Sequence, residues 1–232
     1  MLLRRKSCIV FTAEDLSWAT DNYNESRVFH RDTNEPVYKG TLLEDGVNNP
    51  ITVNRCEKID PIRTQDFICK LVNFSHIDHV NVVKLIGCCL ETKIPLLVYE
   101  FYADMTLYDS IHDEFSFLSW KRRLKIDAET AKSLSYLHSG SEAPITHGDI
   151  NSSNMLQDHG YTVKVSSPSF TGLLGTDSGK SDVYNFGIIL AELLTGDEVL
   201  NSDRPRGEEF LTEYFIFVLK GGRMLEILED LW

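Results

Sequence analysis

The sequence predicts an α+β protein with two lobes. Short β-rich runs separated by turn residues come before residue 102, and amphipathic helical patterns come after it. Such segregation of strands and helices along a chain is typical of α+β folds. The 232 residues, 42% of them hydrophobic, are enough to build a sizeable core. We expect an N-terminal extension over 1–26, a strand-rich lobe over 27–101 and a helical, incomplete lobe over 102–232.

A short helix is expected near the start of the chain. Thr12 is suited to be its N-cap, and Asp15, three residues later, completes a pattern like the capping box. The runs of β-forming residues and the turn residues between them predict the elements that follow. These are strands around 27–40, 51–58, 82–87 and 96–101, a turn over 44–50 and a helix over 62–74.

Two long helices are expected in the second half. In the first, apolar residues recur at steps of three and four, at Trp120, Leu124, Ala128, Ala131, Leu134 and Leu137. The second is apolar almost all round, which predicts burial; its members are Val183, Phe186, Ile189, Leu190, Leu193 and Leu194. Later apolar faces within 210–218 and 225–232 have no following helix to cover them, so we expect a partner surface or an aggregation-prone patch there.

Composition excludes several classes of protein. A net charge of −12 and a pI near 5.0 argue against nucleic-acid binding, which needs a basic face. The five cysteines show no C-x-x-C spacing, as expected of a reduced cytosolic protein. No apolar run is long enough to cross a bilayer. The basic residues at the start allow two interpretations, acylation of Cys8 or a frayed terminus. We therefore expect a cytoplasmic protein, and peripheral attachment to the plasma membrane remains an alternative.

The residues from His147 to Asn154 carry the skeleton of a protein-kinase catalytic loop. That pattern reads H-R-D-L-x-x-x-N, in which Asp acts as base and Asn binds magnesium, and here Asp149 and Asn154 have the required spacing. Further runs occur in the kinase order: 11–23, Val37-Tyr38-Lys39-Gly40, 79–91, 97–101, Tyr136-Leu137-His138 and 180–187. Together they resemble plant receptor-like kinases of the wall-associated-kinase-like branch, over about residues 11–232.

The resemblance places the phosphate-binding positions on residues of the wrong chemistry. The glycine-rich loop falls on 29–36, which contains no glycine and includes Pro36, a residue without an N–H group. A polar hairpin is the simpler expectation for this segment. The lysine that normally pairs with the phosphates is replaced by the neutral Asn54. Its glutamate partner on the next helix is replaced by Lys70, which either reaches into the site as a substitute cation or is a solvated helix residue.

The magnesium-binding positions are degenerate as well. Ser167 stands where the D-F-G aspartate is expected, and a neutral hydroxyl is a poor ligand for a hard cation. Asp158, which belongs to a turn, and Asp177 are available nearby, but we do not expect either to bind the metal. We therefore expect no metal site and no cofactor, and the pattern of substitutions is similar to that of the inactive ZED-related pseudokinases.

The catalytic loop itself retains part of its pattern. Gly148 replaces the usual arginine and Asn151 replaces the lysine that family members place two residues after the Asp. Asp149 could still accept a proton, and the alternative is that His147, Asp149 and Asn154 only tie the loop to the buried helix through Asp182. Only ten residues, 170–179, stand where the family has a longer activation segment ending in A-P-E.

The favoured interpretation is a pseudokinase that serves as an adaptor or decoy in plant immune or receptor signalling. The ZED-related resemblance implies that it binds an NLR immune receptor and receptor-like cytoplasmic kinases. Two alternatives stay open. One is a weak or atypical ATP- and magnesium-dependent serine/threonine kinase, and the other is a shortened splice form of a longer pseudokinase.

Overall fold

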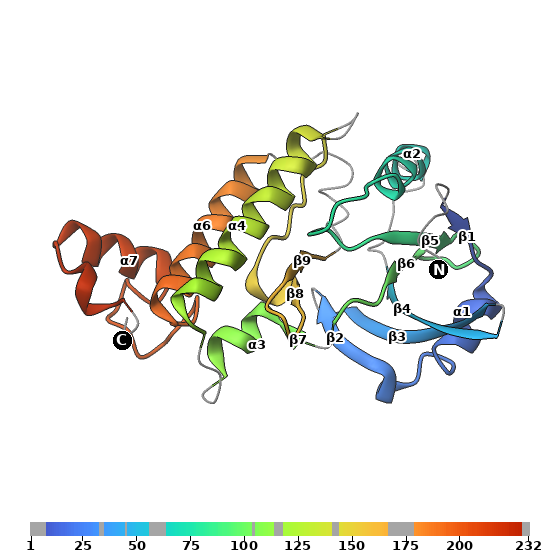
Figure 1. The fold of residues 1–232 in the computed structure, drawn as a ribbon, viewed down its shortest axis with the longest axis horizontal. Helices are drawn as coiled ribbons and strands as arrows, with labels where there is room; N and C mark the ends of the chain where they lie inside the picture. The colour runs from blue at the N-terminus through green and yellow to red at the C-terminus, as the bar shows by residue number, and fades with distance from the viewer. Residues whose placement is uncertain are drawn as a thin grey trace.

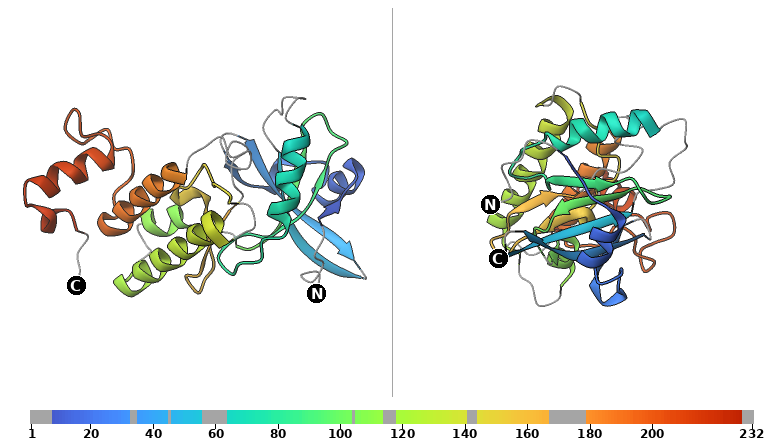
Figure 2. Two further views of the ribbon diagram at one scale, coloured as in Figure 1. Left: turned by 90° about the horizontal axis from the view of Figure 1, so that it is seen from above. Right: turned by 90° about the vertical axis from the view of Figure 1, so that its right-hand side faces the viewer.

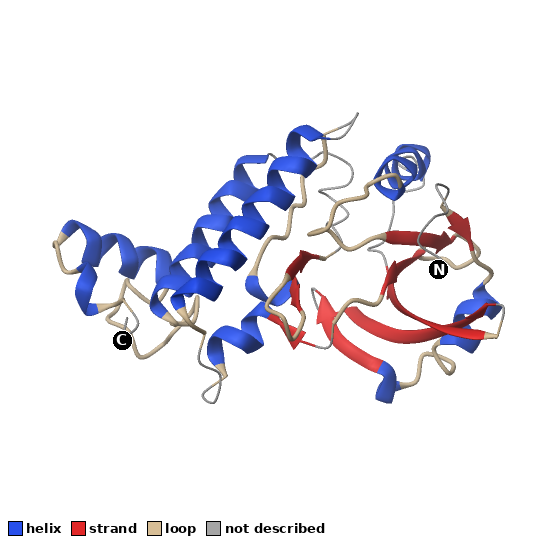
Figure 3. Cartoon of the chain, in the orientation of Figure 1, coloured by secondary structure: helices blue, strands red, loops and turns tan. Residues whose placement is uncertain are grey.

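The computed structural model describes residues 8–32, 35–44, 46–55, 64–103, 105–113, 118–140, 144–166 and 179–228. Within these residues the chain forms two lobes, one built around a six-stranded sheet and the other around helices with a small three-stranded sheet (Figure 1). Most strands lie in one half and most helices in the other (Figure 3). The predicted two-lobed α+β fold is confirmed, whereas the predicted boundaries at residues 26 and 101 stay predictions.

The larger sheet has the strand order β1-β5-β6-β4-β3-β2. Adjacent strands in this sheet are antiparallel, except that β1 runs parallel to β5. The bounds are β1 Ile9–Val10, β2 Val28–Asp32, β3 Glu35–Glu44, β4 Val47–Arg55, β5 Leu85–Cys89 and β6 Leu96–Glu100. The N-terminal extension thus contributes a strand to the sheet. Gly87 makes this possible, because a Cβ there would lie 2.1 Å from the carbonyl oxygen of Ile9.

The predicted turn over 44–50 is wrong in extent. β3 runs to Glu44 and β4 starts at Val47, with a continuous ladder from the Val37–Asn54 pair to the Glu44–Val47 pair. Gly46, at φ +76°, adopts the left-handed conformation that a tight hairpin turn requires. The turn-forming composition of 47–50 is tolerated because this part of the hairpin extends beyond β6 and is largely exposed.

Two helices cover opposite faces of the sheet. α1, Ala13–Ala19, packs on Ile51, Val53, Leu96 and Val98, whereas α2, Thr64–Ser75, packs on Leu85, Leu97 and Tyr99. Residues of β6 contact α1 and α2 in turn, because successive side chains of a strand point to opposite faces of the sheet. The predicted capping box is confirmed, since Thr12 Oγ1 accepts from the N–H of Asp15 at 3.1 Å and Asp15 accepts from the N–H of Thr12 at 3.0 Å.

The helical lobe is centred on α4, Trp120–Ser135, and α6, Gly179–Thr195, which lie side by side (Figures 1 and 2). A π-helical turn, Tyr136–Gly140, extends α4. The other elements are α3 Leu107–His112, α7 Leu211–Lys220 and the strands β7 Met105–Thr106, β8 Met155–Gln157 and β9 Val163–Val165. Their core includes Ile126, Leu134, Met155, Val165 and Ile189.

Two expectations about the later helices are wrong in part. α6 is not buried all round, because Val183 and Tyr184 on its first turns are 62% and 61% exposed. On α7, Leu211 and Val218 belong to the predicted uncovered face but are buried. Phe210 and Leu225 of the predicted faces are exposed, at 51% and 85%, and Ile216, Phe217 and Leu219 add apolar surface on another side of α7. In the described ranges no helix combines the length and apolarity needed to span a bilayer.

Candidate functional site

The catalytic-like loop connects the end of the α4 region to β8. Ser152–Asn154 form a single 3-10 turn whose N-cap is Asn151, and the Asn151 Oδ1 atom accepts from the N–H of Asn154 at 3.0 Å. The amide side chain at position 151 therefore shapes the loop locally. This capping role suits asparagine, because its short side chain bonds to the backbone close by.

Asp182 anchors the start of the loop to α6, as the sequence predicts. Its Oδ1 atom accepts from the N–H of Gly148 at 2.8 Å, and its Oδ2 atom accepts from the N–H of His147 at 2.7 Å. The Nε2 atom of His138 lies 2.8 Å from Oδ2. Gly148 has φ +78°, a conformation that glycine adopts without strain. The Asp182 side chain is fully buried, so these contacts compensate for its loss of hydration.

His147 is fully buried behind the loop. Its Nδ1 atom accepts a hydrogen bond of 3.3 Å from the N–H of Asp149. Burial lowers the pKa of His147, because the charged imidazolium would lose its hydration. The imidazole is thus held neutral and acts as a structural acceptor beneath Asp149.

The carboxylate of Asp149 is bound by neutral amides on both sides. Its Oδ1 atom accepts from Asn151 Nδ2 at 2.9 Å, and its Oδ2 atom accepts from Asn154 Nδ2 at 2.7 Å. The backbone carbonyl of Asp149 also accepts from Asn154 Nδ2 at 3.1 Å. The predicted loop residues Asp149 and Asn154 are therefore brought together, and Asn151 joins them, a partner that sequence reasoning did not foresee.

The phosphate-side positions are only partly described. Asn54 lies on β4 opposite Leu97 of β6, so it faces the same side of the sheet as α2. Lys70 is within α2, but its side chain lies outside the described part of the structure, as do Ser167 and Asp177. The segment in place of the glycine-rich loop forms a β-ladder that reaches the Asp32–Glu35 pair, in agreement with the expected polar hairpin.

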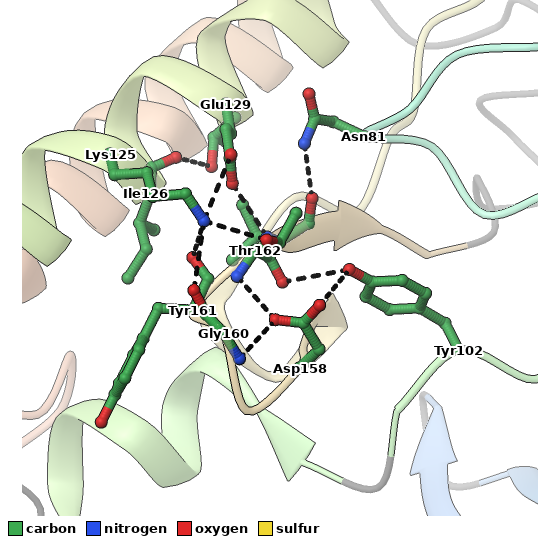
Figure 4. A network of polar contacts seen from close by, with 11 residues as sticks. Asn81, Tyr102, Lys125, Ile126, Glu129, Asp158, Gly160, Tyr161 and Thr162 are labelled. Atoms are coloured by element: carbon green, nitrogen blue, oxygen red, sulfur yellow. Dashed lines mark hydrogen bonds and ion pairs between the residues drawn. The ribbon is translucent and has the colours of Figure 1, made fainter.

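Asp158 is the centre of a structural network rather than an available metal ligand (Figure 4). Its Oδ1 atom accepts from the N–H groups of Gly160 at 2.9 Å and Thr162 at 2.8 Å, and its Oδ2 atom accepts from the Tyr102 hydroxyl at 3.1 Å. Partial burial would raise the pKa of Asp158, but these hydrogen bonds outweigh it and lower the pKa. In the described ranges, no three His, Cys, Asp or Glu side chains form a group that could hold a metal ion.

A model of the protein tyrosine and serine/threonine kinase family matches residues 31–177. This chain belongs to the protein kinase family. Among curated proteins of Arabidopsis thaliana, wall-associated receptor kinase 5 is 37% identical over 247 residues, which cover 95% of this chain and 33% of that kinase. The putative wall-associated receptor kinase-like 16 is 36% identical, with 95% of this chain and 57% of the relative covered. The chain spans about a third of the length of most wall-associated relatives that it matches.

Solved kinase-like structures agree with this assignment of the fold. The pseudokinase domain of BIR2, described as an immune regulator of the RLK/Pelle family, gives a TM-score of 0.72 at 23% identity, covering 94% of this chain and 71% of that one. A second pseudokinase, solved in its apo form, gives a TM-score of 0.72 at 21% identity, covering 96% and 80%. The predicted resemblance to plant receptor-like kinases is confirmed.

The kinase lobes are joined by polar contacts that sequence reasoning missed. Lys164 of β9 lies 2.5 Å from the Oε1 atom of Glu100 at the end of β6, and both side chains are largely buried. Asn81 donates through Nδ2 to the carbonyl of Val163 at 2.8 Å, and the N–H of Val83 donates to the carbonyl of Val165 at 2.9 Å. β9 is therefore attached to the N-terminal lobe at several points.

A buried carboxylate in the kinase-like C-lobe was also missed. Glu192 of α6 is fully buried, and its Oε1 atom accepts from the Ser152 hydroxyl at 3.0 Å and lies 3.3 Å from His112 Nε2. A glutamate within an otherwise apolar helical run was the available signal. Together with Asp182, this residue ties both ends of the catalytic-like loop to α6.

Proposed function

We propose that this kinase-family chain is a pseudokinase that acts as an adaptor or decoy in plant immune or receptor-kinase signalling, without efficient phosphoryl transfer. The observation that carries the proposal is the pairing of the Asp149 carboxylate with the neutral amide of Asn151. In active kinases the residue two positions after the Asp is a lysine. Here Asn151 donates to Asp149 and accepts from the N–H of Asn154, so both ends of its amide are bonded within the loop.

The electrostatics of phosphoryl transfer support the proposal. Catalysis in this family depends on cations that neutralise the transferring phosphoryl group and on precise positioning, and little on the base. Removing one preorganised electrostatic group typically costs about 10²–10³ in rate. Asn54 and Ser167 replace a cation and a metal-binding carboxylate, so very little turnover is expected from the remaining Asp149.

Incorporation of the labelled γ-phosphate of ATP tests this function. We expect no incorporation above background into the chain itself or a generic substrate, and no difference between the wild type and Asp149→Asn. A second variant, Asn151→Ala, removes the amide on one side of Asp149 without adding a cation and should stay equally inactive. Robust incorporation that Asp149→Asn abolishes would overturn the proposal.

A weak ATP-dependent serine/threonine kinase is the second candidate. The retained contact between Asn154 and Asp149 favours it, because both residues keep the spacing and proximity that the family uses. In this candidate Lys70 supplies the missing phosphate cation and magnesium accompanies ATP. It predicts a magnesium-dependent rise in melting temperature with ATP that Lys70→Ala removes, and an unchanged melting temperature at millimolar ATP would eliminate it.

The adaptor function implies protein partners and a cytoplasmic location. By the ZED-related resemblance, the partners are an NLR immune receptor and receptor-like cytoplasmic kinases, and not nucleic acid. The similarity in fold to a pseudokinase described as an immune regulator is consistent with this choice. Affinity capture with a tagged chain from native plant tissue, followed by reconstitution with the purified candidate receptor, tests the partner class.

A further inference from the structure

A pocket of about 350 Å³ lies on the face of the larger sheet that carries α1. It is lined by Tyr23, Tyr38, Val53, Thr92, Lys93, Ile94 and Leu96. Val53 and Asn54 are neighbours on β4, so their side chains point to opposite faces of the sheet. The pocket is therefore separate from the positions at which the kinase family handles phosphate.

The base and walls of the pocket are apolar and aromatic. Val53 and Leu96, at 1% and 5% exposure, belong to the core cluster beneath α1. The rings of Tyr23 and Tyr38 meet edge to face, with centroids 5.5 Å apart and planes at 73°. Small-molecule sites typically combine such apolar walls with a few polar groups, in volumes of about 300–1,000 Å³.

Tyr23 is placed in the pocket by a strained stretch of backbone. Asp21, Asn22 and Tyr23 all have φ +55°, a conformation that is rare for residues other than glycine and exceptional for a bulky one. Hydrogen bonds hold the stretch, from the N–H of Asn22 to the carbonyl of Ser17 at 2.7 Å and from the N–H of Tyr23 to Thr20 Oγ1 at 3.1 Å. Strain of this kind concentrates at ligand-binding sites and persists only where the surroundings enforce it.

Charge selects the kind of ligand. Among the lining side chains Lys93 is the one charged group, and it is exposed at the rim. The nearest acidic residue along the same loop is Glu91, whose Oε2 atom accepts from the N–H of Ala13 at 2.7 Å. Thr92 Oγ1 donates to the carbonyl of Ile94 at 2.6 Å, which tightens the loop that presents Lys93.

We propose that this pocket binds a small amphiphilic carboxylate, with an aromatic or compact hydrocarbon body packed against the two tyrosines and its carboxylate at Lys93. The hydrocarbon body is removed from water against Val53, Ile94 and Leu96, which supplies most of the affinity. The ion pair at the exposed Lys93 adds selectivity for the anion. This inference does not depend on whether the chain transfers phosphate.

Ligand-observed NMR titration of the full chain tests the proposal with two matched probes, 2-naphthoate and the uncharged 2-naphthalenemethanol. The wild type is expected to bind 2-naphthoate saturably and the alcohol about fivefold more weakly, because an exposed ion pair contributes about that factor. Lys93→Met should weaken 2-naphthoate about fivefold and leave the alcohol unchanged. Lys121→Met, an exposed lysine on α4, is the matched control and should change neither affinity.

Ile94→Trp fills the pocket from its half-buried wall and should abolish binding of both probes. If this variant does not fold, the exposed Lys93→Met variant decides the test alone. Absence of saturable binding to the wild type would overturn the proposal, as would binding that neither variant alters. Binding lost in Ile94→Trp but insensitive to Lys93→Met would overturn the assignment of a carboxylate ligand.

Discussion

The Oδ2 atom of Asp182, at the start of α6, accepts a hydrogen bond of 2.7 Å from the backbone N–H of His147. Asp182 also accepts from the N–H of Gly148 and contacts His138, and its side chain is fully buried. The start of the catalytic-like loop therefore depends on the Asp182 carboxylate for its position. Asp182 makes these contacts although the loop carries the neutral residues Gly148 and Asn151 at positions where the family has cations.

Asp182→Ala should lower the free energy of unfolding by about 3 kcal/mol, because the buried N–H of His147 and the partly buried N–H of Gly148 lose their acceptor at about 1–3 kcal/mol each. Urea unfolding followed by circular dichroism measures the change. Glu226→Ala is the control, since Glu226 is 58% exposed and pairs at 3.3 Å with Arg223, itself 45% exposed, and it should cost less than about 1 kcal/mol. Equal effects of the two substitutions would contradict the anchoring role.

The buried His147 predicts a loss of stability on mild acidification. Burial lowers its pKa in the folded state, so below the unfolded value of 6.5 the unfolded chain binds a proton that the folded chain does not. Stability should therefore be complete above pH 6.5 and fall as the pH drops below it, by up to about 1.4 kcal/mol per pH unit. In His147→Gln the change of unfolding free energy with pH should be smaller between pH 6.5 and the folded pKa of His147. An identical pH dependence in both proteins would show that His147 is not the residue responsible.

The pair between Glu100 and Lys164 should couple the lobes energetically. Its side chains are only 17% and 15% exposed, so a double-mutant cycle with Glu100→Gln and Lys164→Met is expected to give a coupling energy of about 1–3 kcal/mol. The Arg223–Glu226 pair, with side chains 45% and 58% exposed, serves as the comparison and should give less than about 1 kcal/mol. Coupling energies that do not differ would mean that this contact does not fasten β9 to the N-terminal lobe.

Gly87 should be indispensable for docking of β1. In Gly87→Ala the new Cβ would lie 2.1 Å from the carbonyl oxygen of Ile9, so β1 has to move away. Hydrogen exchange at the N–H of Phe11, which donates to the Cys88 carbonyl at 2.8 Å, should become much faster.

Gly187→Ala offers a matched control on an exposed turn of α6, where a Cβ meets nothing within 4 Å. This second substitution should stabilise the chain by up to about 1 kcal/mol, because alanine is the better helix former. Unchanged exchange at Phe11 in Gly87→Ala would show that β1 tolerates the added methyl group.

Local patterns in the sequence were sufficient for many elements. The capping box of Thr12 and Asp15 forms within one helical turn, and α4 forms where the apolar steps from Trp120 onward predict a helix. Its buried face was predicted wrongly in part, because Leu124, Ala128 and Ala131 are exposed whereas Ile126 and Thr130 are buried. The turn over 44–50 was misjudged because turn-forming residues were weighed without the ladder between β3 and β4. Likewise, the exposure of Val183 depends on which elements pack against α6, and helical periodicity alone does not reveal that.

The sequence by itself determined the fold class, from its periodicity, and the family together with the residues at the catalytic-like positions, from the resemblance of its motifs to those of plant receptor-like kinases. Tertiary structure alone decided that Asn151 and Asn154 hold the Asp149 carboxylate, that Glu192 supports Ser152, and that Tyr23 and Lys93 share a pocket. Tyr23 and Lys93 stand far apart in the chain and meet only when the sheet and its covering helix are assembled. Their proximity depends on the packing of the whole lobe, which a local pattern does not encode.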